Sequence, residues 1–249
     1  MDLGLTGKAC IVTGATRGIG LATVRMLHAE GAHVLEVART GDDTFHADVT
    51  NPDDAAAIVA ACVERFGTVD ALVNNAGTSF VRSLEELSDH DWQSQWELHV
   101  MGPMRLMREA APLMAARGGG RIVNICSSAG KRPSLTNPAY AVTKAAQLSL
   151  SRVFADRYAA DGVLVNAVTP GAVTSPLWTD EGGLADQAAG ARGISRDEAL
   201  EAQAKKIPLG RFATPEEIAA VVVFLCSERA STVTGAAWSA DGGTFASII

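Results

Sequence analysis

The chain has 249 residues, of which 47% are hydrophobic and 20% are charged, and its formal net charge at pH 7 is −7. This length and balance are typical of one ordinary globular domain and exclude a disordered chain. The acidic balance, with no run of lysine or arginine, excludes a general nucleic-acid binder, and no apolar stretch in the sequence is long enough to cross a membrane.

Strand-like and helix-like segments then alternate along the whole chain. Short apolar runs predict strands at Cys10–Thr13, Val34–Val37, Ala71–Asn74, Arg121–Ile125, Val163–Val168 and Ala236–Ser239, with a further strand near Thr44–Ala47. Such alternation favours an α/β, Rossmann-type doubly wound parallel sheet of about seven strands, with helices on both faces. No linker divides the sequence, so we expect a single domain over residues 1–249.

Several helix boundaries carry recognisable signals. Asn51-Pro52 predicts a cap followed by proline at the first helical position, and Thr214-Pro215-Glu216-Glu217 predicts a capping box. Ser88-x-x-Asp91 predicts the start of a long helix that continues to about Ala116. Only residues 38–43 separate the second strand from the next one, so we expect a loop there instead of a crossover helix.

A glycine-rich turn joins the first strand to a helix. Its sequence is Thr13-Gly14-Ala15-Thr16-Arg17-Gly18-Ile19-Gly20. The order of strand, glycine turn and helix predicts a dinucleotide site, because glycines let the backbone approach a pyrophosphate at the helix N-terminus. A plain strand-to-helix loop is the alternative interpretation of this motif taken alone.

Tyr140 and Lys144 are four residues apart, and Tyr140 follows Ser127 by thirteen residues. The spacing of four places the phenol and the ammonium on one face of a helix. A lysine beside a phenol lowers the phenol pKa from about 10, which would let Tyr140 exchange a proton near neutral pH. Ser127 and its neighbour Ser128 could instead merely cap the end of a strand.

Together these motifs resemble the classical short-chain dehydrogenase/reductase family nearly end to end, including its members that reduce 3-oxoacyl-carrier-protein thioesters. The resemblance rests on Thr13 to Gly20, Asn74 to Gly77, Ser127, Tyr140 with Lys144, Pro170-Gly171, and Asp241 to Gly243. It implies an NAD(P)-dependent oxidoreductase that interconverts a ketone and a secondary alcohol by hydride transfer. A non-catalytic, cofactor-binding regulatory or scaffold protein of the same fold is the alternative.

The resemblance also implies roles for individual residues. In the reaction, Ser127 binds the substrate oxygen, Tyr140 is the general acid or base, and Lys144 holds the nicotinamide ribose. Further cofactor contacts would be Gly14, Thr16, Arg17, Gly18, Ile19 and Gly20 at the pyrophosphate, Asp48 and Val49 at the adenine, Asn75, Ala76 and Gly77 beneath the cofactor, and Pro170, Gly171, Val173 and Ser175 near the nicotinamide.

The choice between NADP and NAD depends on the loop after the second strand. NAD-preferring relatives place an acidic residue at the end of that strand, where this sequence has Ala38 followed by Arg39. Arg39 and Arg17 could pair with a 2′-phosphate through charge-assisted hydrogen bonds, which favours NADP. Asp42 and Asp43 would repel a phosphate or hold a bare ribose, so NAD remains the alternative.

His99 departs from the family pattern, which has a catalytic asparagine at this position. In the family, that asparagine is thought to keep a helix kink whose backbone carbonyl holds a water. His99 could preserve this kink and relay protons, since its unperturbed pKa is near 6.5. The other interpretation is a structural histidine that fills the space.

The segment 176–208 has mixed helical and glycine-rich character, and we expect it to be a mobile lid over the substrate. Leu177, Trp178 and Leu184 could line a largely apolar pocket for a small carbonyl or alcohol substrate. Arg192, Lys205 and Lys206 could meet an acidic carrier or a phosphate, although surface charge is the commoner explanation.

The remaining predictions concern assembly and location. The C-terminal part resembles the portion that packs tetramers in the family, and the apolar run from Val221 to Leu225 suggests a homotetramer, or burial within one subunit. The scattered cysteines and the absence of a basic, apolar leader indicate a cytoplasmic protein with reduced thiols. The spacing of the histidines and cysteines implies no metal site.

Overall fold

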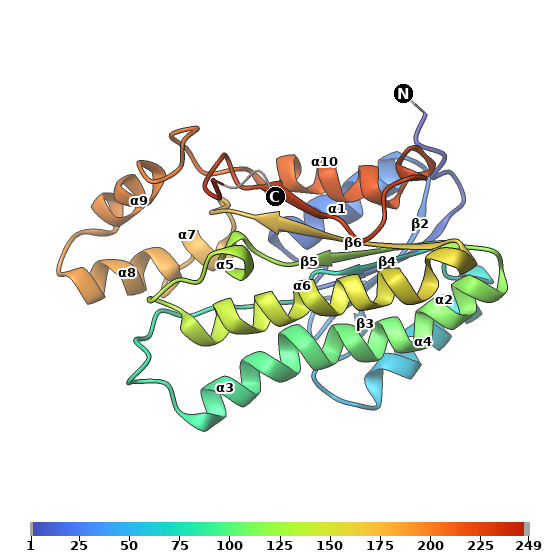
Figure 1. Ribbon diagram of the computed structural model, residues 1–249, viewed down its shortest axis with the longest axis horizontal. Coiled ribbons are helices and arrows are strands. Elements are labelled where there is room, and N and C mark those ends of the chain that lie inside the picture. Colours follow the sequence, from blue (N-terminus) through green and yellow to red (C-terminus); the bar gives the residue numbers. More distant parts are fainter. Residues whose placement is uncertain (1, 247–249) are drawn as a thin grey trace.

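The computed structural model describes residues 2–246. Its centre is one parallel sheet of seven strands in the order β3-β2-β1-β4-β5-β6-β7 (Figure 1). The strands are β1 (Ala9–Thr13), β2 (His33–Ala38), β3 (Phe45–His46), β4 (Ala71–Asn74), β5 (Gly120–Ile125), β6 (Val163–Pro170) and β7 (Ala237–Ala240). The predicted doubly wound parallel sheet is therefore confirmed.

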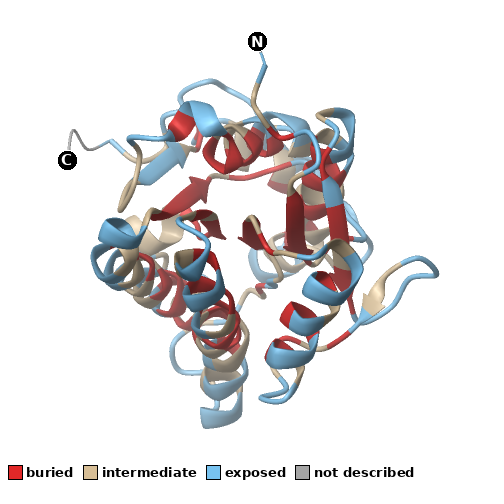
Figure 2. Cartoon of the chain, turned by 90° about the vertical axis from the view of Figure 1, so that its right-hand side faces the viewer, coloured by how far each residue is buried: buried red, intermediate tan, exposed pale blue. Residues whose placement is uncertain are grey.

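Helices cover both faces of the sheet. The helices α1 (Gly18–Ala29) and α10 (Pro215–Cys226) lie on one face, and α2 (Asp54–Phe66), α4 (Gly102–Ala116) and α6 (Pro138–Tyr158) lie on the other (Figure 1). Each layer encloses its own apolar core, and the buried strands lie between more exposed outer helices (Figure 2). Because both faces are covered, the strands are apolar throughout instead of alternating.

The strand order reverses between β1 and β4. From β1 the chain builds the sheet towards β2 and β3 in one direction, and from β4 towards β7 in the other. In an open sheet of this kind, the crevice outside the carboxyl ends of the strands at the reversal is where ligands bind. The glycine-rich turn follows β1, and Asn75 to Gly77 follow β4, so both predicted segments lie at this point.

Two local predictions have opposite outcomes. Residues 39–44 contain no helix, so the loop expected between β2 and β3 is confirmed. The cap predicted at Asn51-Pro52 is wrong, because α2 begins at Asp54. The Asp54 carboxylate accepts hydrogen bonds from the Asp48 backbone N–H and the Asn51 side chain, both at 2.7 Å, so the chain completes a turn before the helix starts.

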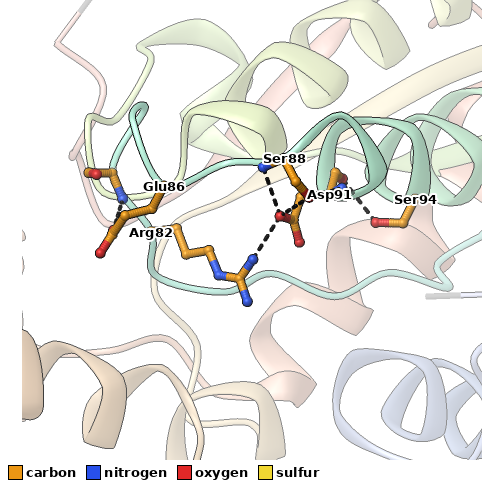
Figure 3. Close-up of polar contacts among 6 residues, drawn as sticks. Arg82, Glu86, Ser88, Asp91 and Ser94 are labelled. Atoms are coloured by element: carbon orange, nitrogen blue, oxygen red, sulfur yellow. Dashed lines mark hydrogen bonds and ion pairs between the residues drawn. The ribbon is translucent and has the colours of Figure 1, made fainter.

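The long helix predicted after Ser88 is present, with a change of winding in its middle. It consists of α3 (Asp89–Trp96), a π-helical segment η1 (Glu97–Met101), and α4. A capping box between Ser88 and Asp91 fixes its start, and Arg82 Nη1 contacts the Asp91 carboxylate at 2.7 Å (Figure 3). The π-helical segment places a local distortion at His99, and such segments are frequent at functional sites.

The other helices are short. They are α5 (Ser128–Lys131), α7 (Pro176–Thr179), α8 (Leu184–Arg192) and α9 (Arg196–Ala204), with 3₁₀ turns η2 (Ala159–Asp161) and η3 (Glu228–Ala230). The capping box predicted at Thr214 is confirmed at the start of α10. Val222, Val223 and Leu225 of α10 are buried within the chain, so the apolar run is largely explained by one subunit. Among residues 2–246, no helix is long and apolar enough to span a membrane.

Candidate active site

A cavity of about 1400 Å³ lies at the carboxyl ends of the strands. The structure brings nearly all of the predicted site residues to its wall: Gly14, Thr16, Arg17, Gly18, Ile19, Arg39, Asp48, Val49, Asn75, Ala76, Gly77, Ser127, Tyr140, Lys144, Pro170, Gly171, Val173 and Ser175. Gly20 and His99 support the wall from behind without lining it. The volume exceeds that of a pocket for one drug-sized molecule and suits a dinucleotide beside a small substrate.

The glycine-rich turn is shaped for close approach of a ligand to its backbone. Gly14 and Gly18 have φ angles of 64° and 55°, a region that favours glycine. A Cβ atom on Gly20 would lie 2.1 Å from the Gly14 carbonyl oxygen, so only glycine lets α1 pack this tightly against the turn. The first turn of α1 contains no acidic residue, and its free backbone N–H groups can donate hydrogen bonds to a phosphate.

Thr13 and Asn75 fasten this turn to the end of β4. The Thr13 Oγ1 accepts the backbone N–H groups of Asn75 and Ala76, both at 3.0 Å. The Asn75 side-chain amide donates to the carbonyl oxygens of Thr13 at 2.9 Å and Gly14 at 3.1 Å. These bonds cross the point at which the strand order reverses, so the two halves of the cofactor wall are held as one unit.

The charged groups near the glycine-rich turn and the loop after β2 differ in their access to the cavity. Arg17 and Arg39 line it, whereas Asp42 and Asp43 are exposed and lie outside the lining. Arg17 Nη1 also lies 3.5 Å from the Asp180 carboxylate, which belongs to the segment after α7. Both side chains of this pair are more than half exposed, so the pair contributes little to stability.

Ser127, Tyr140 and Lys144 meet at the other end of the cavity. Ser127 follows β5 and caps α5, since its Oγ accepts the Ala129 N–H at 3.1 Å. Lys144 is buried, and its Nζ donates to the Ile125 carbonyl at 2.8 Å and to Gln147 Oε1 at 2.9 Å. Ser127 therefore caps the helix that follows β5, and it is also part of the cavity wall.

The pKa of Tyr140 is raised in the structure, whereas the sequence predicted that it would be lowered. Burial raises the pKa of Tyr140 to about 12, and the hydrogen bond with Ser127 opposes this rise. Burial also lowers the pKa of Lys144 to about 8. The expected net lowering of the Tyr140 pKa is wrong because burial outweighs any effect of the Lys144 ammonium, which is directed at Ile125 and Gln147, 5.7 Å from the phenol ring centre. The phenol is therefore protonated at neutral pH and can donate a proton.

His99 lies in η1 with both ring nitrogens engaged. Thr143 donates its hydroxyl hydrogen to the Tyr140 carbonyl at 3.0 Å, so the Thr143 oxygen is left to accept from His99 Nδ1, also at 3.0 Å. The Thr78 backbone N–H donates to His99 Nε2 at 3.4 Å. These three bonds together require the neutral tautomer with hydrogen on Nδ1.

Burial supports the same protonation state. It lowers the pKa of His99 well below 6.5, and the nearby Lys144 charge adds to this effect. The imidazole ring meets the Tyr140 ring edge-on, with centres 5.2 Å apart. His99 thus joins the segment after β4 to α6 directly beneath the tyrosine, which favours a supporting role over proton relay.

The wall beyond Tyr140 combines apolar and polar side chains. Leu177, Trp178 and Leu184 line it, as expected. The expectation of a largely apolar pocket is nevertheless incomplete, because Ser79, Gln95, Ser134, Asn137 and Gln203 share this wall. Among the described residues, Gln95 Oε1 and Asn137 Oδ1 are buried acceptors without a hydrogen-bond partner.

Some residues that shape the site from a distance were not predictable from the sequence. Thr143 and Asn137 carry no local signal, because their partners His99 and Ser79 lie on other elements. Gln147 was detectable in principle, since a residue three positions after Lys144 shares its helix face. Within residues 2–246, no cluster of histidine, cysteine, aspartate or glutamate side chains could hold a metal ion.

Comparison with known proteins gives consistent results. The family model described as enoyl-(acyl carrier protein) reductase matches residues 14–244. The structure of L-sorbose reductase from Gluconobacter frateurii, in complex with NADPH and L-sorbose, has a TM-score of 0.92 and 37% identity, over 100% of both chains. D-beta-hydroxybutyrate dehydrogenase from Rhizobium meliloti is 34% identical over 95% of this chain and 98% of its own length. The 3-oxoacyl-(acyl-carrier-protein) reductase of Thermotoga maritima is 32% identical over 96% and 98%.

Proposed function

Since the chain belongs to the short-chain dehydrogenase/reductase family, we propose that it is an NAD(P)-dependent oxidoreductase that interconverts a ketone and a secondary alcohol. The observation that carries this proposal is the meeting of Ser127, Tyr140 and Lys144 in one cavity with the glycine-rich turn. A bound nicotinamide would supply the hydride. The left-handed glycines and the tight Gly20 packing fit such a cofactor.

The protein's own residues stabilise the negative charge on the substrate oxygen and transfer its proton. As a ketone is reduced, negative charge develops on its oxygen, which the hydroxyl groups of Ser127 and Tyr140 can bind. Tyr140, protonated at neutral pH, then donates its proton to this oxygen. Lys144 keeps a positive charge beside the phenol, which favours the phenolate left behind. In the reverse direction the same groups remove the proton of the alcohol.

The alternative is a protein that binds the cofactor without catalysis. The arrangement of Ser127, Tyr140 and Lys144 supports the enzyme instead. Binding of a nicotinamide cofactor with no turnover of any carbonyl or alcohol, in either direction, would favour the alternative. Binding of neither cofactor would overturn both.

We propose NADP as the preferred cofactor, because Arg17 and Arg39 line the cavity and Asp42 and Asp43 do not. Titration with NADPH and then NADH, followed by nicotinamide fluorescence, is expected to give at least about tenfold tighter binding of NADPH, as one charge-assisted pairing provides. The variant Arg39→Ala is expected to narrow this preference. Arg25→Ala, an exposed arginine of α1 outside the cavity, is the matched control. Equal or tighter binding of NADH would contradict the proposal.

The polar wall supports a hydroxylated ketone as substrate. Gln95 and Asn137 line the cavity together with Ser79, and polar side chains of this kind can bind substrate hydroxyl groups. L-sorbose, the ligand in the similar reductase structure, is a molecule of this kind. We therefore propose polyols and ketoses as substrates in preference to apolar acyl thioesters. Turnover of a panel of ketoses and 3-oxoacyl thioesters with NADPH tests this preference.

We propose that His99 is a positioning residue that holds Tyr140 through Thr143. The variant His99→Ala is expected to lower kcat about tenfold, a part of the roughly hundredfold or more that a well-placed general acid contributes, whereas His99→Asn, which can still donate to Thr143, retains most of the wild-type kcat. The pH–rate profile of His99→Asn should superimpose on that of the wild type, because the imidazole does not titrate in the working range. A shifted profile would restore the proton-relay hypothesis.

Stability gives a second readout for His99. The folded state keeps the imidazole neutral well below pH 6.5, whereas the unfolded chain binds a proton there. The unfolded state therefore gains protons first as the pH falls, and the wild type loses up to about 1.4 kcal/mol of stability per pH unit below about 6.5. Urea unfolding at pH 7.5 and 5.5 should show this loss in the wild type relative to His99→Asn.

Three further proposals concern the molecule as a whole. Residues 176–208 form a lid of three short helices, α7 to α9, whose side chains reach the cavity wall.

Exposed apolar side chains on α4 and α6, Leu113, Val142 and Val153, offer a surface for a homotetramer. A sedimentation mass of one chain would exclude that assembly. The four buried free cysteines support a cytoplasmic protein.

A further inference from the structure

The cavity carries positive charge although the chain is acidic. Formal net charge is −7, yet the charged side chains on the cavity wall are Asp48 and five cations: Arg17, Arg39, Arg132, Lys144 and Lys206. A cleft lined by one sign of charge concentrates ligands of the opposite sign. The charges of the wall therefore oppose those of the whole molecule and favour an anionic ligand.

Three of these cations already have roles in the proposed function. Arg17 and Arg39 lie at the adenosine end, and Lys144 is bonded to Ile125 and Gln147. Arg132 and Lys206 remain. Arg132 follows α5, five residues after Ser127, and Lys206 follows α9 at the end of the lid.

Within residues 2–246, neither the Arg132 guanidinium nor the Lys206 ammonium forms a hydrogen bond or an ion pair. The neighbouring Lys205, by contrast, contacts the Glu201 carboxylate at 2.6 Å, and Arg196 in the same lid contacts Asp186 at 3.6 Å. Lys205 and Arg196 thus pair with acidic side chains, whereas Arg132 and Lys206, which line the cavity and are exposed, are left available to a ligand.

We infer that the substrate carries a carboxylate remote from its reacting carbonyl, and that Arg132 and Lys206 bind this carboxylate. Guanidinium groups match a carboxylate through two parallel hydrogen bonds, and an ammonium adds a point charge. The polar side chains of Gln95 and Asn137 line the same cavity, so the substrate class is a hydroxylated keto acid. This inference rests on the proposed function and names the substrate class of the same site.

A matched pair of ketones tests the inference by turnover. L-sorbose and 5-keto-D-gluconate have the same carbon skeleton and differ in one terminal group, a hydroxymethyl in the first and a carboxylate in the second. The ratio of their kcat/KM values, acid over neutral, is expected to fall about tenfold in Arg132→Gln and in Lys206→Gln, and further in the double variant. The two compounds can differ in the fraction that is present as the open-chain ketone. Because this difference is the same for every variant, it cancels when the ratios of different variants are compared.

Lys205→Gln is the control, because Lys205 is adjacent in sequence but pairs with Glu201 outside the cavity wall. It is expected to keep the wild-type ratio. A ratio that is unchanged in the double variant would overturn the inference. Turnover of L-sorbose that depends on Tyr140 would in that case leave the proposed function standing, so the two failures are distinguishable.

A binding experiment gives an outcome without turnover. Calorimetry with D-gluconate and D-sorbitol, with and without NADPH, is expected to show at least about tenfold tighter binding of gluconate. This difference should disappear in the double variant. Equal binding of the two polyols would overturn the inference. Tighter binding of D-sorbitol 1-phosphate than of gluconate, lost in the same variant, would replace the carboxylate by a phosphate ester and also overturn it.

Discussion

Replacement of Tyr140 by phenylalanine is expected to lower kcat for ketone reduction by about a thousandfold, within the range that a positioned general acid contributes. The ring and its edge-on contact with His99 remain in the variant, and only the hydroxyl group is lost. Affinity for NADPH should stay within about threefold of the wild type, since the pyrophosphate and adenosine contacts are untouched. Single-turnover reduction and fluorescence titration of the same preparation measure the two quantities.

The chain contains only one other tyrosine, Tyr158, which provides the control. It lies at the end of α6, stacks on Phe154 and does not line the cavity. Tyr158→Phe should reduce ketones at the wild-type rate. If Tyr140→Phe kept a third or more of the wild-type kcat, the acid would have to be another group, and the proposed mechanism would fail.

The second large effect is expected from Gly20→Ala. Alanine normally favours a helix over glycine by about 1 kcal/mol. At position 20, however, the new Cβ would lie 2.1 Å from the Gly14 carbonyl oxygen and 2.5 Å from the Asn75 side-chain nitrogen. Neither neighbour can move without breaking the bonds between β1 and β4, so we expect a loss of about 2–3 kcal/mol of stability, as for severe overpacking.

Binding should suffer together with stability, because displacement of α1 opens the turn that would hold the pyrophosphate. Urea unfolding and NADPH titration measure the two effects. Gly190→Ala is the matched control: this glycine also lies in a helix, α8, and its Cβ would have nothing within 4 Å. That variant should gain up to about 1 kcal/mol. An equal effect of the two substitutions would show that packing at Gly20 does not matter.

The features that were predictable from the sequence are those with local causes. Apolar runs between turn residues identified the strands, and the reversal of strand order followed from the fold. The short connection after β2 excluded a helix on length alone. The start of α2 was missed because residues 51–53 form a turn of their own, in which Asn51 Oδ1 accepts the Asp53 N–H at 3.3 Å, before the helix begins at Asp54.

The site shows the same division between local and long-range causes. The spacing of four residues placed Tyr140 and Lys144 on one helix face, but it could not show where the ammonium points. Its partners, the end of β5 and Gln147, are set by the packing of α6 on the sheet. Likewise the tautomer of His99 depends on Thr78 and Thr143, which lie 21 and 44 residues away in sequence. Sequence spacing therefore predicted which residues meet, and packing determined their protonation.

The segment from α7 to α9 affects how the substrate specificity of this protein can change by mutation. Its buried side chains within residues 176–206 are Leu184, Ala185, Ala189 and Ala199, and none of them belongs to either apolar core of the sheet. The segment nevertheless supplies much of the wall that faces the substrate. Substitutions there can change which molecules are accepted while the sheet and the reacting groups keep their geometry. New specificities are thus accessible by substitutions in this segment with little loss of fold stability.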